Sequence, residues 1–214
     1  MLSKQTSFRE TVWNIPNQLT IARLLLSVVF FVLLALETHG TFGGESQLIL
    51  NISLLIFVLA VITDFLDGYL ARKWKLTSTF GRIADPFADK IVVCGGFVML
   101  TGVAPELVEP WFAVVIIFRE FLVSGLRSFL ESRGVAFGSA WIGKLKMLVQ
   151  SLTIPVILFY EANLSTISPG TSVVATFFYW LTLALLATTL VLTIASCSGY
   201  IQRAVKLIRE DGVR

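Results

Sequence analysis

Six apolar segments follow one another along the chain, separated by short polar stretches. Their approximate bounds are 19–36, 48–70, 86–103, 110–130, 143–161 and 172–196. Segments of this length can cross a bilayer as helices, and they lack the alternation of a membrane β-strand. Because backbone groups in lipid must be bonded within their own segment, the pattern predicts an all-α integral membrane protein with six transmembrane helices.

The composition supports a membrane protein and argues against a soluble domain. Of the 214 residues, 56% are hydrophobic and only 14% are charged, whereas about a quarter of a soluble domain is charged. The net charge of +3 is modest, and we expect no nucleic-acid partner. We predict a single membrane domain over 1–214, with a juxtamembrane segment at 1–16 and a cytoplasmic tail at 197–214.

The charged residues between the segments predict the orientation. The stretches 37–47, 104–109 and 161–171 contain glutamates but no Lys or Arg, and all seventeen basic residues lie elsewhere. The positive-inside rule then places both termini in the cytoplasm, and without a targeting peptide a bacterial inner membrane fits best. The N-terminal FRETVWNI is either a short interfacial helix or a disordered tail anchored by Trp13.

Four aspartates lie close together in the sequence, around the junction of the second and third apolar segments, and two of them lie at the end of the second segment. On a helix, residues three, four and seven apart share a face, and Asp64, Asp67, Gly68 and Ala71 have this spacing. One face therefore carries two carboxylates and two small residues. Such small residues would allow a flat or bulky ligand to approach the helix backbone.

The other two aspartates, Asp85 and Asp89, are four residues apart and share a face of the next helix. Gly81 and the polar run before it allow the chain to turn between the helices, and Pro86 either begins the third helix or kinks it. Four facing carboxylates need cations, and oxygen ligands without His or Cys suit Mg²⁺, Mn²⁺ or Ca²⁺. Two divalent ions would balance the charge, and such pairs usually act on phosphate oxygens.

Other functions compete for these aspartates. A single buried carboxylate could be a proton relay or a helix–helix hydrogen bond, but four at this spacing make a purely structural role a poor explanation. A cation transporter would hold its site near the bilayer midplane, whereas these aspartates lie near predicted helix ends.

The full spacing, D-x2-D-G-x2-A-R-x8-G-x3-D-x3-D, resembles the signature of the CDP-alcohol phosphotransferase family. It extends over eight positions without departure: Asp64, Asp67, Gly68, Ala71, Arg72, Gly81, Asp85 and Asp89. The segments NIPNQLTIARLLL (14–26), FGRIADPFADK (80–90), REFLVSGLR (119–127) and GKLKM (143–147) look like the branch that uses sn-glycerol 3-phosphate as acceptor.

The resemblance implies six helices around a cytoplasm-facing polar cavity, usually in a homodimer. It implies two Mg²⁺ or Mn²⁺ ions held by the four aspartates, with Asp89 also as the general base. The donor would be CDP-diacylglycerol, and the acceptor would be glycerol 3-phosphate. Gly68, Ala71 and Gly81 would line the cytidine pocket, and Arg72 would face the charge of the departing CMP.

Further polar residues are candidates for substrate contacts. Asn17, Thr20 and Arg23 recur every three residues at the start of the first segment and point roughly the same way. In relatives this region approaches the nucleotide. The alternatives are a helix cap for Asn17 and a snorkelling side chain for Arg23.

A glycerol phosphate carries about two negative charges and requires a basic pocket. We predict that Arg119, Arg127 and Lys144 form it, with Lys146 as a further candidate. The competing interpretation is contact with anionic lipid. The last segment, rich in Thr, Leu and Ala, is predicted to serve packing.

Three alternatives to this function stay open. A cardiolipin synthase or a phosphatidylinositol phosphate synthase of the same family would use another acceptor. A membrane prenyltransferase also uses aspartates and Mg²⁺, but Arg72 and Gly81 would be unexplained. A divalent-cation transporter would move metal without nucleotide.

Overall fold

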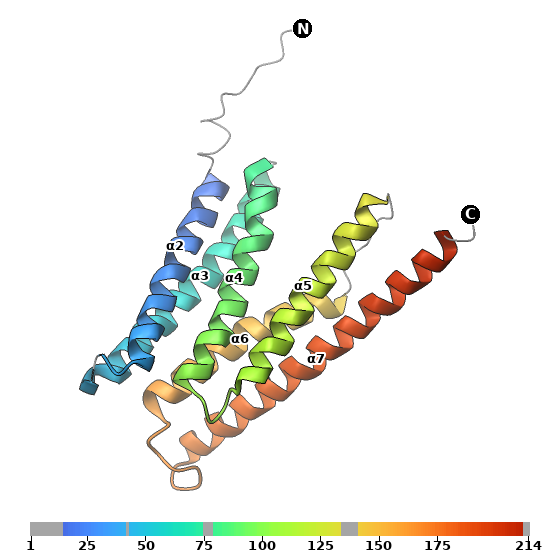
Figure 1. Cartoon of the computed structure of the whole chain (residues 1–214). Helices are drawn as coiled ribbons and strands as arrows, with labels where there is room; N and C mark the ends of the chain where they lie inside the picture. Colours follow the sequence, from blue (N-terminus) through green and yellow to red (C-terminus); the bar gives the residue numbers. More distant parts are fainter. Residues whose placement is uncertain (1–14, 42, 75–78, 134–140, 212–214) are drawn as a thin grey trace. The chain divides into compact units, whose positions relative to one another are not determined.

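The computed structural model describes residues 15–41, 43–74, 79–133 and 141–211, and most of these are helical (Figure 1). Its elements are α2 (Ile15–Thr38), the 3-10 turn η1 (Gly43–Glu45), α3 (Ser46–Trp74), α4 (Thr79–Val103), α5 (Pro110–Ser132), α6 (Trp141–Asn163) and α7 (Val173–Asp211). Within these residues the only β-type pairing is an isolated bridge between Pro169 and Ser172. The all-α prediction is confirmed, while the N-terminal interfacial helix lies almost wholly outside the described residues.

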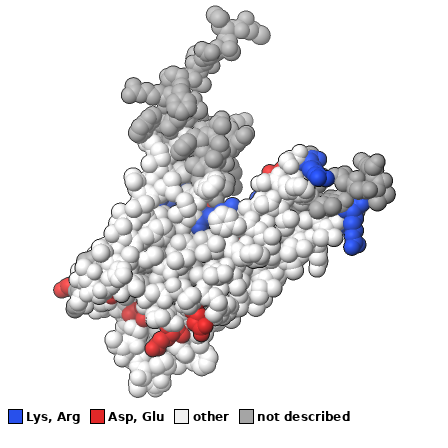
Figure 2. Space-filling model, in the orientation of Figure 1, with Lys and Arg blue, Asp and Glu red and all other residues white. Residues whose placement is uncertain are grey.

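Among the described residues, four helical segments are long and apolar enough to cross a membrane. They are Asn17–Thr38, Ser46–Leu66, Trp141–Asn163 and Val173–Lys206. Charged residues interrupt the remaining two helices, with Asp89 and Lys90 in α4 and Arg119, Glu120 and Arg127 in α5. The surface drawn in Figure 2 is mostly uncharged, as expected for a membrane protein. The count of six spans stays a prediction.

The chain forms two compact units, residues 1–103 and 104–214, each with its own packing. In the first unit α2 packs against both α3 and α4, and Phe30, Phe57 and Phe97 are buried in its core. In the second unit α7 packs against both α5 and α6, and Ile154 and Ile157 are fully buried. In each unit, therefore, one helix packs against two others: α2 in the first unit and α7 in the second.

Two helix boundaries differ from the predicted ones. α4 begins at Thr79, so Gly81 and Pro86 lie within a helix and Gly81 is not part of a turn, while residues 75–78 of the polar run lie outside the described residues. α7 continues to Asp211, well beyond the predicted end at 196. Hydropathy marks the part of a helix that suits lipid, whereas backbone hydrogen bonding continues past it. The extension of α7 is also packed, since Tyr200 and Ala204 are buried against Val123 and Leu130 of α5.

Glycine permits the close approach of α2 and α4. A Cβ atom added to Gly95 would lie 2.3 Å from Cζ of Phe31, and one added to Gly102 would lie 2.8 Å from Cγ2 of Thr38. These glycines are seven residues apart and therefore share a face of α4. Small residues at such positions let helix backbones pack closely in a membrane protein.

We expect Gly95→Ala to lower the free energy of unfolding by about 1–3 kcal/mol, because the new methyl group displaces the Phe31 ring. Gly125→Ala is the matched control, since a Cβ there meets nothing within 4 Å. Thermal unfolding in detergent measures both, and Phe31→Leu should partly rescue Gly95→Ala. Equal stability of the two alanine variants would contradict the close packing.

Candidate active site

Arg23 of α2 lies between two of the four motif aspartates. Its Nη1 is 2.6 Å from Oδ1 of Asp64 on α3 and 2.7 Å from Oδ1 of Asp89 on α4. The Arg23 side chain is 1% exposed, whereas those of Asp64 and Asp89 are 28% and 32% exposed. One nitrogen of a buried side chain therefore contacts partly exposed carboxylates from two different helices.

The polar residues of α2 form one buried face. Asn17, Thr20 and Arg23 are each at most 2% exposed, so the three lie together as their spacing predicts. Ser27 extends this face and donates a hydrogen bond from Oγ to the Arg23 carbonyl at 2.7 Å. Burial at this depth argues against a snorkelling Arg23. The assignment of these residues to CDP-lipid binding stays a prediction.

For the remaining motif residues, the structure describes little beyond the helix to which each belongs. Gly68 belongs to α3 and is half-buried. The side chains of the others lie outside the described residues, although their backbones belong to α3 or α4: Asp67, Ala71, Arg72, Gly81 and Asp85. The structure thus shows one carboxylate from each half of the motif, brought together at Arg23.

The two described carboxylates can be tested as ligands for a metal ion. Both approach a single positively charged nitrogen, so their oxygens are separated by no more than the sum of the two short distances. That spacing lets two oxygens share one cation, and carboxylate oxygen is the donor that Mg²⁺ and Mn²⁺ prefer. No group of three possible metal ligands occurs among the described side chains, so a complete site would need Asp67 and Asp85.

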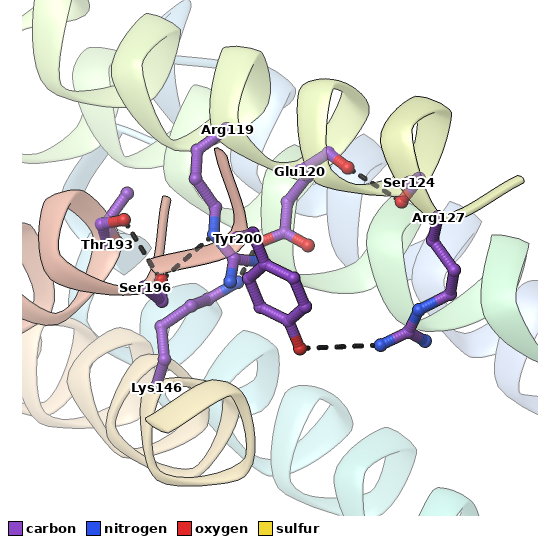
Figure 3. A network of polar contacts seen from close by, with 8 residues as sticks. All are labelled: Arg119, Glu120, Ser124, Arg127, Lys146, Thr193, Ser196 and Tyr200. Atoms are coloured by element: carbon purple, nitrogen blue, oxygen red, sulfur yellow. Dashed lines mark hydrogen bonds and ion pairs between the residues drawn. The ribbon is translucent and has the colours of Figure 1, made fainter. Parts of the chain in front are cut away.

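A second polar cluster lies within the other unit (Figure 3). Glu120 of α5 accepts a hydrogen bond from Nη1 of Arg119 at 3.0 Å and forms an ion pair with Nζ of Lys146 on α6. These side chains are largely buried, with 14%, 8% and 5% exposed for Glu120, Arg119 and Lys146. Two buried cations therefore share one carboxylate.

α7 contributes two residues to this cluster that the sequence did not reveal. Ser196 Oγ accepts a hydrogen bond from Arg119 Nε at 3.1 Å, and the Arg119 guanidinium lies 5.8 Å from the Tyr200 ring centroid. Tyr200 Oη also accepts a 3.4 Å hydrogen bond from Arg127 Nη2. Helix α7 therefore does more than the predicted packing. No sequence pattern distinguishes Ser196 or Tyr200 from its neighbours.

Only three of the four predicted acceptor residues belong to this cluster. Arg119, Arg127 and Lys146 belong to it (Figure 3), whereas Lys144 is exposed. Their spacing explains the difference, because residues two apart on a helix point in different directions. Arg127 Nε is buried and has no hydrogen-bond partner in the described part of the chain, so this guanidinium retains a donor for another group.

Comparisons with known proteins agree with the motif. Residues 13–195 match the CDP-alcohol phosphatidyltransferase family. A CDP-diacylglycerol–glycerol-3-phosphate 3-phosphatidyltransferase of Bacillus subtilis is 34% identical over 161 residues, which cover 73% of this chain and 82% of the relative. A protein of the same name from Rickettsia typhi is 39% identical over 145 residues, covering 68% and 76%.

The chain belongs to the CDP-alcohol phosphatidyltransferase family and is therefore an enzyme, a transferase of phospholipid synthesis. The family is generally dependent on divalent metal ions. A relative from Mycoplasma genitalium with the same name is 31% identical over 185 residues, covering 78% of this chain and 73% of its own. The residues matched by the family model, 13–195, span both aspartate pairs as well as Arg119 and Lys146.

We expect Arg23→Met to lower the free energy of unfolding by about 3–5 kcal/mol in metal-free buffer. Removing one partner of a buried ion pair leaves the other uncompensated, here Asp64 and Asp89. Denaturant unfolding in detergent measures the change. Arg133→Met is the control, because Arg133 is exposed and contacts the Phe129 ring, with no ion pair in the described part of the chain. If the two variants are equally stable, Arg23 does not neutralise the aspartates.

Proposed function

We propose that this enzyme transfers the phosphatidyl group of CDP-diacylglycerol to sn-glycerol 3-phosphate, producing phosphatidylglycerol phosphate and CMP. The observation that carries the proposal is the shared name of the relatives, CDP-diacylglycerol–glycerol-3-phosphate 3-phosphatidyltransferase, at 34% and 39% identity. The unbroken aspartate motif supports the same chemistry. Membership of this family replaces the prenyltransferase and cation-transporter interpretations.

In the proposed reaction a free hydroxyl oxygen of glycerol 3-phosphate attacks the phosphorus that carries diacylglycerol. A new P–O bond forms there, the diphosphate P–O bond to CMP breaks, and the hydroxyl proton passes to the Asp89 carboxylate. About a third of the Asp89 side chain is exposed, which supports access by a substrate. Reactions of this kind depend mainly on positioning and on neutralisation of charge.

Asp64, Asp67, Asp85 and Asp89 are the residues proposed to hold two Mg²⁺ or Mn²⁺ ions. When bound, the ions would supply positive charge to the diphosphate and would acidify the attacking hydroxyl. The convergence of Asp64 and Asp89 on one nitrogen supports this assignment, because it brings both halves of the motif to a single cation. Arg23 provides a permanent charge beside them.

The donor is assigned to the same unit. Asn17, Thr20 and Arg23 lie on one buried polar face of α2, and Arg23 contacts Asp64 and Asp89. This arrangement supports contact with the nucleotide diphosphate. The other residues assigned to CDP-diacylglycerol are Asp64, Asp67, Gly68, Ala71, Arg72 and Gly81.

The acceptor phosphate is assigned to Arg119, Arg127 and Lys146. The shared carboxylate of Glu120 offsets only one of the two positive charges of Arg119 and Lys146, which leaves a net positive cluster. An unpartnered buried donor on Arg127 adds to this. Such a cluster suits a phosphate carrying about two negative charges. The assignment of exposed Lys144 rests on the sequence alone.

The setting of the reaction is also a proposal. We place the enzyme in a bacterial inner membrane with six spans, with both termini and the polar cavity facing the cytoplasm, and as a homodimer. The basic and acidic loops support this orientation, and bacterial relatives support the location.

An assay of CMP release from CDP-diacylglycerol with different acceptors tests the function. We expect release with glycerol 3-phosphate, and little with phosphatidylglycerol or inositol phosphate. Asp89→Asn should abolish turnover while the protein stays folded and still binds the CDP-lipid. No release with glycerol 3-phosphate would refute the acceptor, and an active Asp89→Asn enzyme would refute the base.

Ser196→Ala should raise the KM for glycerol 3-phosphate by about tenfold or more, since a hydrogen bond to a charged group contributes about 1.5–3 kcal/mol and about 1.4 kcal/mol corresponds to tenfold. The KM for CDP-diacylglycerol should not change. Tyr200→Leu should have a larger effect than Tyr200→Phe, because only the former removes the ring beside Arg119.

Thr189→Val is the control for these α7 variants. It removes a buried contact between α7 and α6, 2.9 Å from Thr153 Oγ1, without touching the cluster. If it changes the KM for glycerol 3-phosphate as much as Ser196→Ala does, then the effect reflects helix packing.

A further inference from the structure

A cavity of about 380 Å³ lies in the second unit, where α5 begins and α6 ends. Its volume lies in the range of small-molecule sites. Glu106 and Leu107 border it from the segment before α5, and Tyr179 borders it from α7. Tyr160, Glu161 and Ser165 complete its polar lining. None of these residues takes part in the proposed transfer reaction.

The cavity carries negative charge that nearby residues of the chain do not offset. Glu106 and Glu161 both line it, and no ion pair to either is found in the described part of the chain. The sequence contains no Lys or Arg in 91–118 or in 147–202, which include every lining residue. A cation that neutralises these carboxylates would therefore come from outside the cavity's own segments.

Tyr160 gives an independent indication of a ligand. The residue is 6% exposed and borders the cavity, and no hydrogen bond of its hydroxyl is found among the described residues. Its ring contacts that of Tyr179, with centroids 6.0 Å apart and an interplanar angle of 49°. With no partner found for it in the described part of the chain, the Tyr160 hydroxyl keeps its hydrogen-bonding capacity for a ligand in the cavity.

We propose that this cavity binds a primary ammonium group. The carboxylates of Glu106 and Glu161 would neutralise its charge, and the Tyr160 hydroxyl would accept one of its N–H bonds. The two tyrosine rings favour an organic cation, because aromatic faces attract ammonium groups. A hard metal ion would instead require more oxygen ligands than two carboxylates offer. The ammonium group could belong to a soluble amine or to a lipid headgroup.

Titration calorimetry of the full-length protein in detergent tests the proposal, with ethanolamine as the probe at constant ionic strength. We expect saturable binding that is weakened about tenfold by Glu161→Gln or Glu106→Gln, as loss of about 1.4 kcal/mol would produce. Tyr160→Phe should also weaken it. Glu109→Gln should not, because exposed Glu109 lies outside the cavity and accepts a 2.8 Å hydrogen bond from Trp111.

Several results would overturn the proposal. One is the absence of saturable ethanolamine binding. A second is that Glu109→Gln weakens ethanolamine binding as much as Glu161→Gln does. A third is that CaCl₂ or tetramethylammonium binds as tightly as ethanolamine. Nanodiscs with and without phosphatidylethanolamine then distinguish the two sources of the ammonium group. If that lipid blocks ethanolamine binding, the headgroup is the ligand, and if it does not, the ligand is a soluble amine. Phosphatidyl transfer is expected to be unchanged in all four variants.

Discussion

A charge inside a helical membrane bundle needs a neutralising partner, and this requirement organises both units of the protein. Arg23 is almost completely buried and is paired with Asp64 and Asp89 from two other helices. In the second unit, Arg119 and Lys146 are paired with Glu120. Isolated ions at membrane depth are costly, so each pairing restricts how its helices can pack. The same pairing fixes where the charged groups of the candidate active site lie.

One helix in each unit combines packing with polar contacts. α2 contacts both α3 and α4, and its buried face carries Asn17, Thr20 and Arg23. α7 contacts both α5 and α6, and it supplies Ser196 to Arg119. Because these polar groups lie on the helix that holds the unit together, small shifts in packing would move them. Gly95 shows how closely the helices meet, since a Cβ added there would lie 2.3 Å from Cζ of Phe31.

Local patterns predicted most of the helices and the chemistry of the aspartates. Hydropathy located the helix centres, but it misplaced the start of α4 and the end of α7. In both cases the helix includes polar residues beyond its apolar part. The spacing of Asn17, Thr20 and Arg23 predicted a common direction, and all three are buried. The partner of Arg23 could not be predicted, since Asp89 is 66 residues away in sequence.

The sequence by itself determined the helical class, the acidic motif and the family, because these depend on short-range periodicity and on residue spacing. Only the tertiary structure decided which of two neighbouring lysines is buried, with Lys146 paired to Glu120 and Lys144 exposed. It also decided that Ser196 and Tyr200 contact the arginines, and that Tyr160 borders an acidic cavity. These features depend on which helix faces are brought together, and contacts between distant segments leave no periodic signal in the chain.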